Sequence, residues 1–242
     1  MLRSVDVLSA LGSTLVRGAA GMRIGVLGPR PAQRLELYEF EACPYCRKVR
    51  EALSILDLEV LVKPCPKGGP RYREEVKRRG GRALFPFLVD PNAGKEMYES
   101  DDIVAHLFQA YGVGPPPKRL RPGAVTDGTS MLASLLRPGA GARYRRAREP
   151  AQPLELWSFE ASPFCRLVRE RLSSLELPYV LHNVARNSPG RAAFVQRSGK
   201  LMVPYLADPN TGQALFESAD ICRYLDRTYA VGATAGTGRA AS

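Results

Sequence analysis

The chain has 242 residues, of which 45% are hydrophobic and 24% are charged. This composition is typical of one or two soluble globular domains, each with enough chain for a buried core. The formal net charge is +11, but the basic residues are spread along the sequence without a recognition motif or an aromatic platform, so nucleic-acid binding is not favoured. No apolar run approaches the roughly 18–20 residues that a membrane span needs.

The first 33 residues are rich in arginine and serine and contain a single acidic residue, Asp6. This composition resembles an organellar transit peptide. Residues 14–23 recur loosely as residues 134–143, however, and a segment copied along the chain has a use beyond targeting. We therefore expect part of residues 1–33 to pack on the mature protein, with any transit peptide upstream or at the extreme start.

An internal repeat with a period of about 119 residues dominates the sequence. Three blocks return at a nearly constant offset: residues 35–47 as 154–166, 85–92 as 203–210, and 99–103 as 217–221. Three aligned blocks in one order indicate a duplicated domain. The predicted organisation is an N-terminal segment (1–33), a first domain (34–112), a linker with at most one short helix near residues 130–136 (113–152), a second domain (153–231) and a disordered tail (232–242).

Both copies predict the same series of elements. In the first copy these are a strand (35–40), a helix (44–56), a strand (59–63), a charged helix (71–79), two strands that form a hairpin (84–89 and 96–98) and a last helix (100–111), with Ser100 as its N-cap. The order βαβαββα predicts a mixed sheet flanked by helices, since β–α–β segments favour parallel pairs and the hairpin adds antiparallel strands.

The turn Cys43-Pro44-Tyr45-Cys46 lies between the first strand and the first helix of the first copy. At a helix N-terminus, free backbone N–H groups and the helix dipole stabilise negative charge, so the Cys43 thiol is expected to be more acidic than the roughly 8.5 of a free cysteine. The basic residues that follow act in the same direction. We interpret Cys43 as an exposed nucleophile and Cys46 as a second thiol turned inward.

The five cysteines do not indicate a disulfide framework, because their number is odd and only Cys43 and Cys46 lie close together in the sequence. Cys165 and Cys222 are expected to be small buried hydrophobic residues, and Cys65 to be incidentally exposed in a loop. A structural zinc site needs four ligands, and the chain offers one cysteine pair and two isolated histidines. No metal is therefore expected.

The βαβαββα order with Cys-Pro-Tyr-Cys after its first strand resembles the glutaredoxin family. The Glu-Ser pair before the last helix, together with Phe-Glu-Ala-Ser-Pro-Phe-Cys in the second copy, resembles the thioredoxin-like N-terminal domain of glutathione transferases. The tandem arrangement is similar to plant and algal plastid proteins with two such domains. The resemblance implies two tandem thioredoxin-like α/β domains without the all-helical domain that houses the electrophile in transferases.

The resemblance also implies roles for individual residues. Cys43 would attack a mixed disulfide and Cys46 would resolve it. The contacts to glutathione would come, in the first copy, from Tyr45, Arg47, Phe85, Pro86, Glu99 and Ser100, and in the second from Ser162, Val203, Pro204, Glu217 and Ser218. Pro86 and Pro204 match the family's cis-proline. Ser100 and Ser218 could also be N-caps, and both roles can hold together because a capped helix N-terminus also binds carboxylate. Arg47 could equally belong to a solvated helix face.

The second copy has Ser162 in place of Cys43 and keeps Cys165 in place of Cys46. A serine hydroxyl cannot carry out thiol–disulfide exchange. Ser162 could hydrogen-bond a glutathione thiolate, as in serine-type transferases by resemblance, or the copy could be a binding or packing module.

The sequence thus favours a glutathione-dependent thiol–disulfide oxidoreductase that acts on glutathionylated proteins or small disulfides through Cys43. A glutathione transferase, a non-catalytic glutathione-binding module and an iron–sulfur carrier stay open as alternatives. Glutathione is the expected cosubstrate, and the chloroplast is the expected location.

Overall fold

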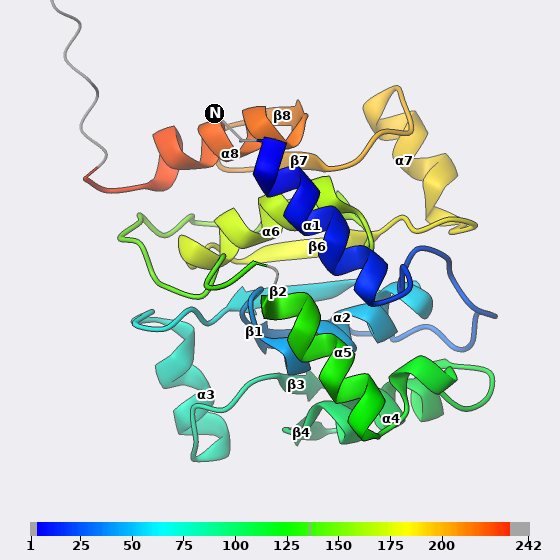
Figure 1. Cartoon of the computed structure of the whole chain (residues 1–242). Helices are drawn as coiled ribbons and strands as arrows, with labels where there is room; N and C mark the ends of the chain where they lie inside the picture. Colours follow the sequence, from blue (N-terminus) through cyan, green and yellow to red (C-terminus); the bar gives the residue numbers. More distant parts are fainter. Residues whose placement is uncertain (1–3, 136, 233–242) are drawn as a thin grey trace, which may run out of the picture.

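The computed structural model describes residues 4–135 and 137–232, and Figure 1 shows helices on both sides of a central sheet. The first repeat forms β1 (Leu35–Glu39), α2 (Pro44–Ile55), β2 (Val60–Pro64), α3 (Tyr72–Gly80), β3 (Phe87–Asp90), β4 (Lys95–Met97) and α4 (Ser100–Tyr111). The second forms β5 (Leu154–Ser158), α6 (Pro163–Ser174), β6 (Tyr179–Asn183), α7 (Gly190–Ser198), β7 (Tyr205–Asp208), β8 (Gln213–Phe216) and α8 (Ser218–Tyr229). The predicted order βαβαββα is confirmed in both copies.

The strands of the two repeats form one continuous sheet of eight strands in the order β4-β3-β1-β2-β6-β5-β7-β8. Within each repeat the first two strands pair in parallel and the last two add antiparallel partners. The repeats meet where β2 pairs antiparallel with β6, with Leu61 opposite Val180. The sequence predicts a mixed sheet in each copy, and this pairing of edge strands joins the two into one.

The apolar core lies in layers on the two faces of the sheet. On one face, α2, α4, α6 and α8 share a single cluster of buried side chains that runs across both repeats, from Leu37 and Leu53 to Leu172 and Leu225. On the other face, α3 and α7 each cover a separate cluster, around Phe87 and Trp157 respectively. The continuous cluster makes the two repeats one packed body.

Two further helices, α1 (Ser4–Val16) and α5 (Ala124–Leu135), lie side by side over the face that carries α2 and α6 (Figure 1). Each crosses to the other repeat: α1 precedes the first repeat but packs on α6, and α5 precedes the second repeat but packs on α2. The Ser13 hydroxyl donates to the Ala133 carbonyl at 2.7 Å and ties the two helices together. A 3-10 turn, Lys118–Leu120, precedes α5.

The expected linker helix is therefore present but begins earlier than residue 130. Apart from Gly232, the expected disordered tail lies outside the described residues. In the part of the chain that the structure describes, no helix is both long and apolar enough to cross a membrane.

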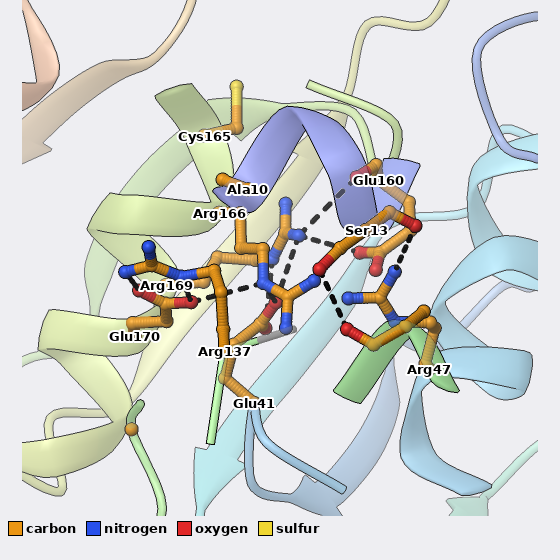
Figure 2. A network of polar contacts seen from close by, with 12 residues as sticks. Ala10, Ser13, Glu41, Arg47, Arg137, Glu160, Cys165, Arg166, Arg169 and Glu170 are labelled. Atoms are coloured by element: carbon orange, nitrogen blue, oxygen red, sulfur yellow. Dashed lines mark hydrogen bonds and ion pairs between the residues drawn. The ribbon is translucent and has the colours of Figure 1, made fainter. Parts of the chain in front are cut away.

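A buried network of ion pairs lies where the repeats meet (Figure 2). The Arg169 guanidinium contacts both Glu41 oxygens at 3.1 Å and Glu160 at 2.8 Å. Arg50, its counterpart in the first repeat, contacts Glu160 at 3.1 Å and Glu41 at 3.3 Å. Because each arginine contacts the carboxylate of its own repeat and that of the other, the network links the two copies symmetrically.

Candidate functional site

The first candidate site is built around the amino end of α2. Cys43 occupies the N-cap position and Pro44 begins the helix, where its missing N–H costs no hydrogen bond. The Cys43 sulfur accepts a hydrogen bond from the Cys46 backbone N–H at 3.3 Å. The Cys-Pro-Tyr-Cys turn thus holds the Cys43 sulfur against the backbone N–H of Cys46 at the first turn of α2.

The pKa values of the two thiols are shifted in opposite directions. A hydrogen bond from the Cys46 thiol lowers the pKa of Cys43, and the backbone N–H groups of Cys46 and Tyr45 add to this effect against burial and the charge of Glu39. Burial raises the pKa of Cys46 well above its usual range. The site therefore makes Cys43 the more acidic of the two thiols.

The expectation that Cys43 is exposed is wrong, because only 4% of its surface is accessible and Cys46 is fully buried. Its sulfur lies 3.9 Å from the Phe85 carbonyl. The neighbouring helix α5 docks on the start of α2, where the Ser130 hydroxyl donates to the Pro44 carbonyl at 2.6 Å. A helix from the linker thus packs against the start of α2, next to the turn.

A cavity of about 290 Å³ opens beside this turn. Five of the predicted glutathione contacts line it, together with two residues that the sequence analysis missed; its walls are Tyr45, Leu84, Phe85, Pro86, Tyr98, Glu99 and Ser100. The peptide bond between Phe85 and Pro86 is cis, as the resemblance implies. Leu84 and Tyr98 directly precede predicted site residues, so their position in the chain was the available signal.

The edge of this cavity at α4 has an unusual backbone. Glu99 has a φ of +62°, in the left-handed region that non-glycine residues rarely adopt, and its carbonyl accepts from the Ile103 N–H at 2.9 Å. The helix begins at Ser100, so Glu99, and not Ser100 as predicted, occupies the N-cap position. Such strained residues cluster at ligand sites. The Glu99 side chain makes no capping hydrogen bond, and the first N–H groups of a helix can bind an anion.

Arg47 is not among the residues that line this cavity. Its side chain is buried, and it donates to the Ser13 carbonyl of α1 at 3.4 Å (Figure 2). The structure therefore places Arg47 between α2 and α1, apart from the other predicted contacts.

The second repeat carries a matching site with a different first side chain. The Ser162 hydroxyl accepts from the Cys165 N–H at 3.3 Å, the distance found at Cys43. A cavity of about 190 Å³ lies beside it, and its walls are Phe164, Met202, Val203, Pro204, Glu217 and Ser218. The bond before Pro204 is cis, and Glu217 repeats the positive φ of Glu99 at +64°. Met202 and Phe164 are the lining residues that the sequence analysis missed.

The other cysteines and the histidines lie elsewhere. Cys165 and Cys222 are buried as predicted, whereas Cys65 is buried against expectation, because α3 covers the end of β2. His106 bonds Asp90 at 2.8 Å, and His182 pairs with Glu59 at 2.5 Å. Within residues 4–135 and 137–232, no group of three or more metal-ligating side chains comes together.

The βαβαββα order, the cis-proline and the cysteine turn at the first helix define a protein of tandem thioredoxin-like domains. Residues 37–117 and 156–235 each match the family "Glutathione S-transferase, N-terminal domain". These matches cover more than half of the chain, and the chain belongs to this family.

Similar solved structures are also glutathione transferases. Glutathione transferase BmGSTD1 of Bombyx mori is 25% identical over 38% of this chain, with a TM-score of 0.32, and the chain spans 44% of its length. TDR1 of Leishmania, a trimeric glutathione transferase, is 15% identical, with a TM-score of 0.30. The match covers 87% of this chain and 70% of the TDR1 chain. No curated protein sequence matches the chain significantly.

Proposed function

We propose that the chain is a glutathione-dependent thiol–disulfide oxidoreductase that removes glutathione from glutathionylated proteins or small disulfides through Cys43. The family supports glutathione as the ligand. The observation that carries the redox assignment is the contrast between the two thiols, since hydrogen bonds lower the pKa of Cys43 while burial raises that of Cys46. A thiolate beside a protonated thiol is the arrangement that thiol–disulfide exchange requires.

The proposed reaction begins with attack of the Cys43 thiolate on the glutathione sulfur of a mixed disulfide. The substrate sulfur leaves with the electron pair of the broken S–S bond and takes a proton, while Cys43 becomes disulfide-bonded to glutathione. The intermediate is resolved either by a second glutathione or by Cys46, which releases glutathione and forms the Cys43–Cys46 disulfide. In the first route one glutathione thiol is oxidised as the substrate thiol is released. In the second route Cys43 and Cys46 are oxidised to a disulfide as the substrate thiol and glutathione are released.

The cavity beside the turn would hold the glutathione. Its γ-glutamyl carboxylate would face the free N–H groups at the start of α4, next to Glu99 and Ser100, and its cysteinyl backbone would lie along Phe85. The second cavity would bind glutathione without exchange chemistry, because Ser162 has no thiolate to offer.

Release of glutathione from a glutathionylated model protein tests the proposal. Cys43→Ser should abolish release, whereas Cys165→Ser, which changes the buried counterpart of Cys46 in the second repeat, should leave it within about twofold of wild type. Release that survives in Cys43→Ser would contradict the proposal.

The geometry at Ser162 also supports a second candidate, a glutathione transferase activity of the second repeat. The hydroxyl stands where Cys43 stands in the first repeat and could donate to a bound glutathione thiolate. Conjugation of a chloronitrobenzene that is lost in Ser162→Ala but kept in Cys43→Ser would favour this activity.

We also propose a chloroplast location, which rests on the resemblance and on the arginine-rich start of the chain. Import of a fluorescent fusion tests it.

A further inference from the structure

The two helices that cross between the repeats carry an exposed apolar face. Of the sixteen large hydrophobic residues that are exposed in the described part of the chain, seven lie on α1 and α5, each with 41–69% of its surface accessible. These seven residues, which we call the α1–α5 apolar face, are Val5, Leu8, Leu11, Leu15, Met131, Leu132 and Leu135. In α1 their spacing of three or four residues places them along one side of the helix.

The polar side chains of these helices point the other way. Ser13 of α1 is fully buried against α5, and Ser130 of α5 donates to a backbone carbonyl of α2 at 2.6 Å. Directly after α1, the buried Arg17 pairs with Glu51 of α2 at 2.9 Å. A surface helix ordinarily packs its apolar side inward and exposes its polar side. Here polar contacts fix both helices to the protein, and the apolar side is left exposed.

The internal repeat has this apolar face in both of its copies. The offset of 120 residues that relates residue 14 to residue 134 also relates Leu11 to Met131 and Leu15 to Leu135. Because the two helices lie side by side over α2 and α6, their outward sides form one surface (Figure 1). Single exposed apolar residues are common on proteins, whereas a contiguous patch marks a surface that binds a protein or a membrane.

Basic residues lie at both ends of this face, while the two helices themselves contain no lysine or arginine. At one end, the exposed Arg119 donates to the Gly18 carbonyl just after α1 at 3.0 Å, and the exposed Lys118 precedes it in the 3-10 turn before α5. At the other end, the exposed Arg143 lines a cavity of about 360 Å³ together with Asp6 of α1. An apolar surface between basic ends is complementary to a bilayer surface with anionic headgroups.

The charge of the chain argues against a second copy as the occupant, because that copy would bring the same basic ends and another net charge of +11. Residues 233–242 contain no large hydrophobic side chain that could cover the face.

We propose that the α1–α5 apolar face binds the surface of a membrane that contains anionic lipids. The leucines enter the boundary between headgroups and acyl chains, and the basic ends contact lipid phosphates. The chain then lies on the membrane without crossing it, and high salt weakens the attachment by screening the basic ends.

Sedimentation of the full chain with large vesicles tests the proposal. One set of vesicles is pure phosphatidylcholine, and the other contains about 30% phosphatidylglycerol, which supplies the negative charge. The wild type should bind the anionic vesicles. Its binding should fall by about tenfold or more when phosphatidylglycerol is left out, and also when the salt is raised to about 1 M.

Variants of exposed residues separate the apolar and the basic contributions. The double variant Leu8→Gln with Leu132→Gln keeps helix-forming residues but removes apolar surface, and it should bind the anionic vesicles about tenfold more weakly or less. Lys118→Gln should weaken binding by about fivefold. The matched controls are Val195→Gln on α7 and Lys77→Gln on α3, which change exposed residues on the opposite face of the sheet and should bind as the wild type does.

Absence of binding to both kinds of vesicle would overturn the proposal, and so would equal binding to both. Binding that the double leucine variant leaves unchanged would also overturn it, since charge alone would then account for the attachment. A dimer that the wild type forms in sedimentation equilibrium and the leucine variant does not, without vesicle binding, would assign the face to a second copy instead. Glutathione takes no part in these measurements, so their outcome is independent of the proposed function.

Discussion

Arg50 of the first repeat and Arg169 of the second converge on one carboxylate oxygen, Oε2 of Glu160, at 3.1 and 2.8 Å. All three side chains are almost entirely buried, and Glu41 completes the arrangement from the other repeat. The boundary between the copies is therefore held by charge as well as by the β2–β6 pairing, and each arginine depends on a carboxylate from across the boundary.

Removal of one member of this network should destabilise the whole chain. Glu160→Gln leaves two buried guanidinium groups to share Glu41 and Glu39, and loss of one partner from a buried ion pair costs about 3–5 kcal/mol. Asp220→Asn removes the partner of Arg223 in an exposed pair on α8 and should cost less than about 1 kcal/mol. Urea unfolding measures both, and similar small losses in the two variants would contradict the role assigned to the network.

The loss of folding stability at low pH should depend on Asp90 and on its counterpart in the second repeat, Asp208. Burial alone would raise the pKa of Asp90, but hydrogen bonds from His106, Asn92 and Tyr111 outweigh it and lower the pKa. Because the folded-state pKa lies below the unfolded value, the stabilisation is present above about pH 4 and is lost as the pH falls through the folded-state pKa.

Asp90→Asn should therefore cost about 1.5–3 kcal/mol at pH 7 and less below pH 4. Asp208→Asn should behave alike, since the Tyr224 hydroxyl bonds Asp208 at 2.6 Å and the same kinds of bond lower its pKa. Urea unfolding of the wild type and both variants at pH 3 and at pH 7 measures how the cost in free energy of unfolding changes with pH. A cost in Asp90→Asn that does not change with pH would contradict this reading.

The docking of α5 on α2 should control access to Cys43. Ser130→Ala removes the hydrogen bond to the Pro44 carbonyl, which is worth about 1 kcal/mol. Because α5 would then separate from α2 more easily, alkylation of Cys43 should be about fivefold faster. Ala10, at the equivalent place in the repeated segment, shows that alanine fits there. Ser198→Ala, which removes a hydroxyl within α7, is the control and should leave the alkylation rate unchanged.

Alkylation of Cys43 by iodoacetamide should have its midpoint below the roughly 8.5 of a free cysteine, because hydrogen bonds from Cys46 favour the thiolate. Cys46→Ala removes the thiol that donates to Cys43 and should raise this midpoint. A midpoint at or above 8.5 in the wild type would argue against an activated nucleophile and for a binding module.

Ser162→Cys should install a second reactive thiol. The backbone at Ser162 (φ −77°, ψ 120°) nearly equals that at Cys43 (φ −72°, ψ 122°), and Cys165 already stands behind it. In a Cys43→Ser background, the new cysteine should take up glutathione from oxidised glutathione. Mass spectrometry after timed incubation distinguishes the adduct from the internal disulfide.

The sequence by itself determined the features that depend on neighbours along the chain. Alternating and helical periodicity, together with the turn residues, predicted β1, α2 and the hairpin to within a few residues, because these elements follow from local hydrogen bonding and the pattern of buried side chains. The repeat showed that the chain contains the same domain twice. The resemblance implied the two cis-prolines that the structure contains, and most of the residues it names as glutathione contacts line the two cavities.

Only the tertiary structure decided how the copies meet and what surrounds Cys43. The β2–β6 pairing joins strands more than a hundred residues apart, and local periodicity says nothing about which edges are complementary. Cys43 is buried and its sulfur lies against the Phe85 carbonyl from the loop before β3, α5 crosses to α2, and Arg47 contacts α1, all of which depend on segments distant in the sequence. Glu39 reads in the sequence as an ordinary charged residue at the end of a strand. Its burial beside Arg50, which brings its pKa to about 7, exists only once α2 has packed on the sheet.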